Sequence, residues 1–185
     1  AKLVSQSLFD RMDRGNQVLR LGLGTSAQSV EFFRKAVAIK PDDAAAWGLL
    51  AVGHQRVSGT SSRQAAGVAA QACEQAARRA LALNRREPNA LAALALLQRK
   101  LDDWLRTEKR LRDVLAIDAG NMAALDALVA LWQSAGFIRE SWDLNERAIA
   151  RDPLRPILQQ RRALKHWIMG RPLEAGQTIE RAFEL

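Results

Sequence analysis

The sequence predicts an all-α fold, a stack of repeated helical hairpins known as an α-solenoid. Hydrophobic residues recur at helical spacing along nearly the whole chain of 185 residues. Four alanine-type positions near the ends of similar segments follow one another at intervals of 34 residues: Ala80, Val114, Ala148 and Ala182. Such a period in helical sequence is typical of paired helices that stack on their neighbours, so we expect about five hairpins in a right-handed superhelix.

The first hairpin is predicted between residues 3 and 40. One helix is expected from about Leu3 to Arg20, where two nearby glycines interrupt the pattern. Its partner is expected from about Ser26 to Ile39. It stops at Pro41, because proline has no amide hydrogen and does not continue a helix.

The second hairpin is predicted between residues 42 and 84. Asp42 or Asp43 is expected to cap its first helix, since a carboxylate accepts hydrogen bonds from the free amides of a helix N-terminus. Residues 57–62 have the composition of a loop. The second helix is then expected from Arg63 to Leu83.

Two irregularities interrupt the repeat. Ala36 and Ala80 are 44 residues apart, ten more than the 34-residue period, so the second hairpin carries an insertion. The insertion either lengthens the helices or forms a surface loop. In the last hairpin, Gln159 and Arg162 stand where the other hairpins have apolar core residues. We expect function at these two places rather than at the regular repeats.

Three regular hairpins complete the chain, over about residues 88–118, 121–151 and 154–185. Their helices are expected over residues 89–99 and 104–117, 121–134 and 139–151, and 154–169 and 172–185. Residues 1–185 are therefore interpreted as a single repeat domain, belonging to a longer protein.

These segments resemble the tetratricopeptide repeat family. Trp47, Leu50 and Ala51 match the pattern of the family's first helix, and Ala148 and Pro153 match that of its second. The resemblance covers about residues 3 to 185. It implies that the first helix of each hairpin lines a concave groove, and that the protein binds other proteins and is not an enzyme.

The resemblance also implies which residues contact a partner in the groove. The candidates are Arg56, Asn89, Leu96, Arg99, Lys100, Asp126, Gln133, Ile157, Gln160, Leu164, Trp167 and Ile168. Asn89, Arg99 and Lys100 form only an incomplete version of the clamp with which some family members grip a chaperone's C-terminal carboxylate, so a chaperone adaptor is not expected. Arg56, Arg99 and Lys100 either receive an acidic peptide or are solvated charges.

An apolar helix face is predicted in the last hairpin. Ile157, Leu164 and Ile168 lie at spacings of 7 and 4 residues, with Trp167 beside them. They form either an apolar patch that binds a partner or a face buried against the final helix or a further repeat.

The charge favours an acidic partner. Lys and Arg number 28 against 20 Asp and Glu, a net charge of +8. An acidic protein segment, an anionic lipid surface and nucleic acid all fit such a charge. Because the basic residues are interleaved with acids, nucleic acid is not the expected partner. No apolar run reaches the length of a membrane span, so a cytoplasmic location is expected, or a periplasmic one if a longer protein supplies an anchor.

No catalytic, cofactor or metal site is predicted. The sequence Gly22-Leu23-Gly24 lacks the rest of a dinucleotide-binding motif. Cys73 is interpreted as a small buried hydrophobic residue. His54 and His166 are 112 residues apart, without other ligands at suitable spacing, and are interpreted as packing residues.

A narrower resemblance gives the alternative function. The stretched second hairpin and the segment Arg151-Asp152-Pro153-Leu154 look like certain bacterial proteins in which such repeats follow a winged-helix DNA-binding domain or an adenylate-cyclase domain. That resemblance implies a sensing or self-association module, with a homo-oligomer as the assembly. The leading hypothesis remains a protein-interaction scaffold that binds a partner peptide or domain.

Overall fold

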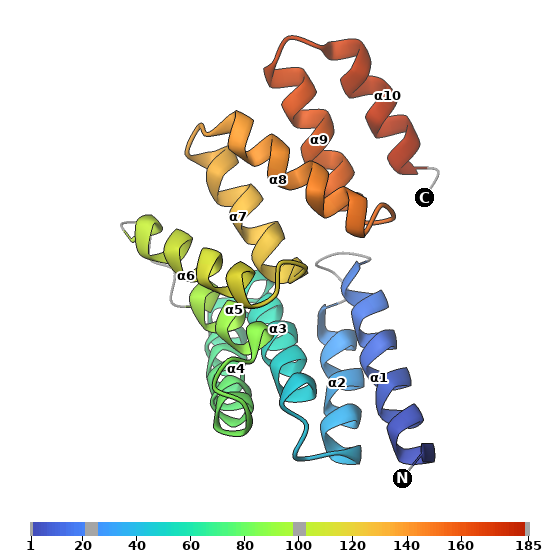
Figure 1. Cartoon of the computed structure of the whole chain (residues 1–185), viewed down its shortest axis with the longest axis vertical. Coiled ribbons are helices and arrows are strands. Elements are labelled where there is room, and N and C mark those ends of the chain that lie inside the picture. The colour runs from blue at the N-terminus through green and yellow to red at the C-terminus, as the bar shows by residue number, and fades with distance from the viewer. Residues whose placement is uncertain (1, 21–25, 98–102, 184–185) are drawn as a thin grey trace. The chain divides into compact units, whose positions relative to one another are not determined.

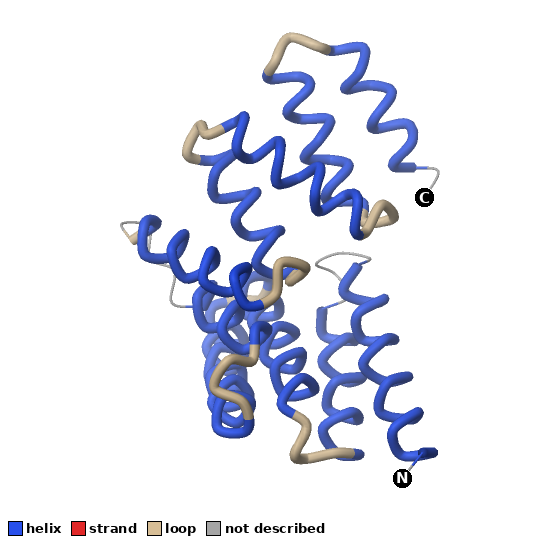
Figure 2. Tube along the Cα trace, viewed as in Figure 1, coloured by secondary structure: helices blue, strands red, loops and turns tan. Residues whose placement is uncertain are grey.

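The computed structural model describes residues 2–20, 26–97 and 103–183, with side chains of the first helix from Gln6 onward. Within these ranges the regular structure is entirely helical, which confirms the predicted fold class (Figures 1 and 2). The helices are α1 (Lys2–Arg20), α2 (Ser26–Ile39), α3 (Ala44–Thr60), α4 (Arg63–Leu83), α5 (Pro88–Leu97), α6 (Trp104–Ile117), α7 (Met122–Ser134), α8 (Ile138–Arg151), α9 (Pro156–Ile168) and α10 (Pro172–Phe183).

The predicted loop over residues 57–62 is wrong for residues 57–60 and confirmed for Ser61 and Ser62. Helix α3 continues to Thr60, and only Ser61 and Ser62 separate it from α4. The glycine and hydroxyl residues suggested a loop, but the Thr60 hydroxyl donates a hydrogen bond to the carbonyl of Arg56, 3.1 Å away, which suits a helical backbone. The inserted residues therefore lengthen the second hairpin instead of forming a surface loop.

Residues 1–118 form one unit of three hairpins. Helix α3 lies at its centre and packs on α2, α4 and α5. Asp43 caps this helix by accepting from the amide of Ala46 at 2.9 Å. The core is rich in alanine, and Phe33 is its largest fully buried side chain. Small side chains let neighbouring helices approach closely, so α2, α3 and α4 present a shared face.

Two glycines in this unit are required by close packing. A Cβ at Gly15 would lie 2.8 Å from Cδ1 of Phe33, so only glycine lets α1 approach the buried ring. A Cβ at Gly48 would meet the carboxylate of Glu87. Glu87 is 2% exposed and accepts from the amide of Ala90 at 2.6 Å, so it caps α5 beside α3. Burial raises the pKa of Glu87, and the hydrogen bonds oppose that rise.

Residues 119–185 form the second unit, with two hairpins. Leu125, Leu128 and Leu158 are buried in its core. The turns after α7 and α9 contain Gly136 and Gly170, whose φ values of 85° and 73° lie in the left-handed region that favours glycine. Both turns fall where the sequence predicted them.

Side-chain hydrogen bonds join the helices of this second unit. Ser141 of α8 donates to the carbonyl of Val129 at 2.9 Å. Asn145, also of α8, donates to the carbonyl of Leu158 at 3.1 Å. Because these donors are buried, each bond satisfies a group that would otherwise destabilise the interface. The bonds fix α8 between α7 and α9, and so position the residues of α9 discussed below.

Candidate functional site

The second unit contains a hollow of about 460 Å³ between α7, α9 and α10, called the C-terminal hollow below. It is lined by Gln133, Ile157, Gln160, Arg161, Ala163, Leu164, Trp167, Ala175 and Ile179. Five of the lining residues belong to the predicted partner contacts, and four of those five lie on α9. The prediction that they form a binding site remains a prediction, but the structure brings them together.

The rim of the C-terminal hollow is apolar and exposed. Leu164 is 45% exposed, Trp167 is 66% exposed and Ile179 is 45% exposed. Ile168, another predicted contact, is exposed without lining the hollow. Helix α10 therefore does not cover the apolar face of α9, and the expectation that this face is buried against the final helix is wrong. Contact with a partner would remove this surface from water, and each Å² of apolar area buried would stabilise the complex by about 25 cal/mol.

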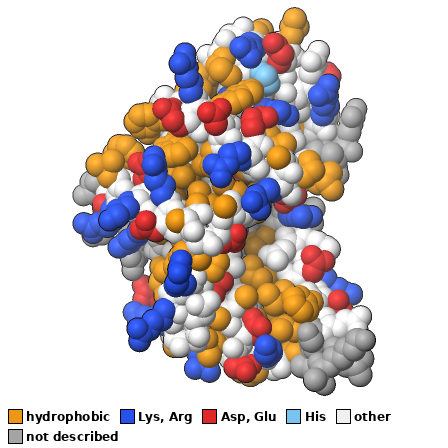
Figure 3. Space-filling model, viewed as in Figure 1, with side chains coloured by type: hydrophobic (Ala, Val, Ile, Leu, Met, Phe, Trp, Pro, Cys, Tyr) orange, Lys and Arg blue, Asp and Glu red, His pale blue; other side chains and the backbone are white. Residues whose placement is uncertain are grey.

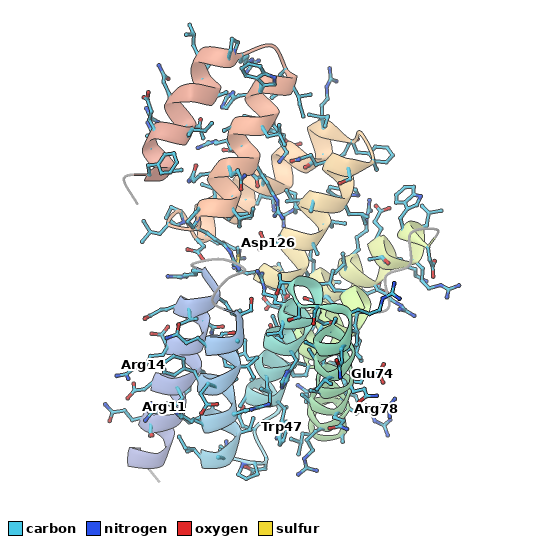
Figure 4. All side chains as sticks on the ribbon, turned by 180° about the vertical axis from the view of Figure 1, so that it is seen from behind. Arg11, Arg14, Trp47, Glu74, Arg78 and Asp126 are labelled. Carbon is cyan, nitrogen blue, oxygen red and sulfur yellow. The ribbon has the colours of Figure 1, made fainter. Side chains whose placement is uncertain are left out.

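The one charged lining residue of the C-terminal hollow is already paired. Nη1 of Arg161 lies 2.9 Å from Oδ1 of Asp126, and it also donates to the Asp126 carbonyl at 3.0 Å. Arg155, 5% exposed, lies 3.5 Å from the other carboxylate oxygen. Asp126, a predicted partner contact that is labelled in Figure 4, is thus buried in α7 and paired with two arginines.

The first unit contains a second hollow, of about 580 Å³, between α2, α3 and α4, called the N-terminal hollow below. It is lined by Ala27, Val30, Arg34, His54, Val57, Ser62, Gln64, Ala65, Val68, Ala69 and Ala72. Eight of these eleven residues belong to α3, α4 and the turn between them. The hairpin that carries the insertion therefore supplies most of the wall.

The electrostatics of the N-terminal hollow differ from those of the C-terminal one. Arg34 is the only charged residue among the described residues that line it. Among the residues that the structure describes, no carboxylate lies within ion-pair distance of Arg34. Burial first, and the charge of Arg34 second, lower the pKa of His54 to about 4. His54 is therefore neutral at pH 7, and the hollow carries one positive charge.

The remaining predicted contacts have varied surroundings. Asn89 is half-buried and its amide donates to Glu87 at 3.1 Å. Arg56 on α3 and Leu96 on α5 are half-buried in the first unit. Arg99 and Lys100 lie outside the described residues. The predicted contacts are thus divided between the two units, and each unit has its own hollow.

Two buried reactive groups stand apart from both hollows. Burial first, and Glu74 second, raise the pKa of Cys73 to about 12, so its thiol stays protonated. Lys165 is fully buried in α9; burial and then Arg161 lower its pKa to about 8, while Glu146 opposes the change. Since neither group reaches the surface, neither is placed to attack a substrate.

The structure offers no metal cluster or membrane span within the ranges it describes. No group of three His, Cys, Asp or Glu side chains in these ranges could hold a metal ion. No helix in them is both long enough and apolar enough to cross a bilayer. On the face shown in Figure 3, basic, acidic and apolar side chains are interspersed, and blue and red groups alternate rather than forming one large field.

The comparison with known proteins defines the fold. No protein-family model and no curated protein matches the chain. A thermophilic TPR (tetratricopeptide repeat) protein from Thermus thermophilus matches with a TM-score of 0.62 at 15% identity, over 96% of this chain and 90% of that one. MamA matches with a TM-score of 0.55 at 15% identity, over 87% and 88%.

A third structure carries a functional description. YrrB, described as a TPR protein with an unusual peptide-binding site, matches with a TM-score of 0.51 at 11% identity, over 94% of this chain and 84% of that one. At such identities the likeness is one of fold. The chain therefore has the tetratricopeptide-type fold that the 34-residue spacing predicted.

None of the residues that line the N-terminal hollow was among the predicted contacts, and part of the C-terminal hollow was also missed. Arg34 and Val68 were not among the predicted contacts, because they do not lie on the first helices of hairpins. Arg161 and Ile179 were missed for different reasons: the arginine was not assigned to the groove, and the isoleucine lies on a second helix. The ten-residue insertion was the one signal that pointed to the N-terminal hollow.

Proposed function

We propose that this chain is a non-enzymatic protein-interaction scaffold, and that the C-terminal hollow receives apolar side chains of a partner protein. The observation that carries the proposal is the exposed apolar rim of Leu164, Trp167 and Ile179 around a concave surface. Large aromatic and aliphatic side chains at a concave site provide most of the binding energy in protein interfaces.

The paired charge in this hollow supports an apolar rather than an acidic partner segment. The carboxylate of Asp126 already neutralises Arg161, so a second carboxylate would gain little there. Gln133 and Gln160 can hydrogen-bond a partner's backbone at the edge of the hollow. The site therefore suits an amphipathic helix or an extended segment that inserts one or two apolar side chains.

The fold supports the same proposal. Stacks of helical hairpins present extended surfaces that bind other proteins, and the peptide-binding description of YrrB supports a peptide as partner. Self-association uses the same chemistry, because a second copy also offers an apolar rim. It is the second candidate function, in agreement with a sensing or assembly module.

Peptide display tests the proposal. Peptides selected from a random library on the wild-type chain are expected to bind at least about tenfold more weakly to Leu164→Glu, because a buried unpaired carboxylate opposes apolar contact. Leu173→Glu is the matched control: Leu173 is 79% exposed on α10 and does not line the hollow. The affinity of the selected peptides for Leu173→Glu should differ less than twofold from that for the wild type, as measured by fluorescence anisotropy.

Two results would decide against the proposal or modify it. Equal affinities of wild type and Leu164→Glu would exclude the C-terminal hollow as the peptide site. A light-scattering mass of two chains that falls to one chain in Leu164→Glu would assign the rim to self-association. A mass of one chain in both forms leaves a foreign protein as the partner.

A further inference from the structure

We propose that the N-terminal hollow binds a short acidic peptide segment of a partner protein, with the peptide's carboxylate on Arg34 and an aliphatic side chain against Val30 and Val68. The site is separate from the C-terminal hollow and differs from it in chemistry. It goes beyond the scaffold function, because it assigns a second ligand class to the inserted part of the chain.

The helices arrange the lining residues in order along the hollow. Helix α3 packs against α2. A Cβ placed on Gly53 would lie 3.0 Å from Cγ2 of Val30, so Gly53 of α3 and Val30 of α2 lie at the same level. His54 is next to Gly53 and therefore lies near the level of Val30, one helical turn from Arg34, whose charge lowers its pKa. Ala27 lies seven residues before Arg34, about 10 Å along the helix, and the two residues mark the ends of the wall that α2 supplies.

The distribution of polar groups favours a peptide over a simple acyl chain. Ser62 and Gln64 are polar lining residues near the α3–α4 turn, whereas Arg34 and His54 are the polar groups at the other end. The wall between them is aliphatic. A fatty acyl chain has one polar end, but a peptide has hydrogen-bonding groups along its length that match polar groups at both ends. About 10 Å accommodates roughly three extended residues.

The charge of Arg34 is available for a ligand. The acid on its own helix, Glu31, lies 3.6 Å from Lys35, and the acid on the neighbouring α4, Glu74, lies 3.1 Å from Arg78. Both pairs are on exposed helix surface, and Figure 4 shows Glu74 and Arg78 projecting away from α4. A guanidinium binds a carboxylate through two parallel hydrogen bonds, which gives an acidic segment an advantage over a neutral one of equal shape.

Titration with a matched pair of peptides tests the proposal. The probes are acetyl-Val-Ala-Glu-amide and its glutamine counterpart, added to the nitrogen-15-labelled full chain and followed by amide chemical shifts. We expect the glutamate peptide to bind about tenfold more tightly, because a carboxylate attracts the guanidinium by its charge and accepts two parallel hydrogen bonds, whereas a glutamine offers one neutral oxygen. The shifts should centre on Ala27, Val30 and Val68.

Variants of two arginines separate this charge effect from general attraction to a basic protein. Arg34→Gln should bind both peptides equally weakly. Arg79→Gln, which removes an exposed charge on α4 outside the hollow, should keep the preference for glutamate. The dispersion of the amide spectrum reports whether each variant is folded.

Four outcomes would overturn the proposal. Equal binding of the two peptides to the wild-type chain would remove the role of the charge. An unchanged preference in Arg34→Gln would place the recognition elsewhere, as would shifts confined to residues 119–185. Tighter binding of octanoate than of the glutamate peptide would assign the hollow to an acyl ligand. If Leu164→Glu showed that the C-terminal hollow does not bind peptides, these measurements on the N-terminal hollow would still stand. The two proposals can therefore fail separately.

Discussion

The N-terminal and C-terminal hollows have similar walls but differ in whether the charged residue has a counter-ion. Each has an aliphatic wall built from three helices and a single charged lining residue, which is an arginine. Arg161 lies 2.9 Å from the buried carboxylate of Asp126. Arg34 faces His54, which burial keeps neutral. From this comparison we expect the ligand preference of each hollow to depend on whether the fold already supplies a counter-ion to its arginine.

The two hollows also differ in how their walls are built. The N-terminal hollow lies between α2 and the lengthened α3 and α4. The C-terminal hollow lies between α7, α9 and α10, whose packing leaves Leu164 and Trp167 exposed. The insertion therefore contributes concave surface to the first unit.

Removal of the counter-ion should give the largest effect and make the two hollows alike. Asp126→Ala leaves Arg155 buried without its carboxylate, and we expect the free energy of unfolding to fall by about 3–5 kcal/mol. Arg161 would then be unpaired, so the C-terminal hollow should gain a preference for acidic peptides. Urea unfolding measures the first effect, and titration with the glutamate and glutamine peptides measures the second.

An exposed ion pair provides the control for this variant. Glu74→Ala removes the partner of Arg78 on the surface of α4, and the free energy of unfolding should change by less than about 0.5 kcal/mol. If Asp126→Ala were as mild as Glu74→Ala, the buried carboxylate would not be what distinguishes the two hollows.

Acid should weaken the first unit through His54. The unfolded state binds a proton below about pH 6.5, whereas the folded state does so only near its lowered pKa of about 4. Folding stability is therefore lost as the pH falls from 6.5 to 4, by roughly 3 kcal/mol from this group. His54→Gln should remove that part of the loss when urea unfolding is compared at pH 7 and pH 4.

A bound carboxylate provides a further check on the same residue. The glutamate peptide should raise the pKa of His54, because a nearby negative charge favours the protonated ring. The glutamine peptide should leave it unchanged. An acid-induced loss of the same size in wild type and His54→Gln would show that His54 is not held neutral in the hollow.

Two glycine variants test how α2 and α4, the walls of the N-terminal hollow, are held. Gly15→Ala should destabilise the chain by about 1–2 kcal/mol, since its Cβ would press on the ring of Phe33 and displace α2. Gly67→Ala meets no atom within 4 Å on α4 and should stabilise it by up to about 1 kcal/mol. Thermal unfolding measures both changes in stability, and we expect them to have opposite signs. Changes of the same sign would contradict the packing of α1 on α2.

The helices were largely predictable because local chemistry determines them. Helices α2, α4 and α6 begin and end at the predicted residues. The end of α3 was not predictable, because Ser, Gly and Thr favour loops locally and the structure overrides that preference. On α9 the spacing of Ile157, Leu164 and Ile168 predicted one apolar helix face, with Trp167 beside it. Ile157, Leu164 and Trp167 line the C-terminal hollow, whereas Ile168 does not.

The sequence by itself determined the helices and the apolar face of α9, because these follow from residues within about three turns of each other. It also determined the hairpin period, because similar segments recur at intervals of 34 residues. Only the tertiary structure decided which arginine has a counter-ion. Asp126 and Arg161 are 35 residues apart, and no local pattern marks them as partners. Packing of α9 beside α7 brings their charges together, whereas packing around the lengthened α3 and α4 leaves Arg34 open to a ligand.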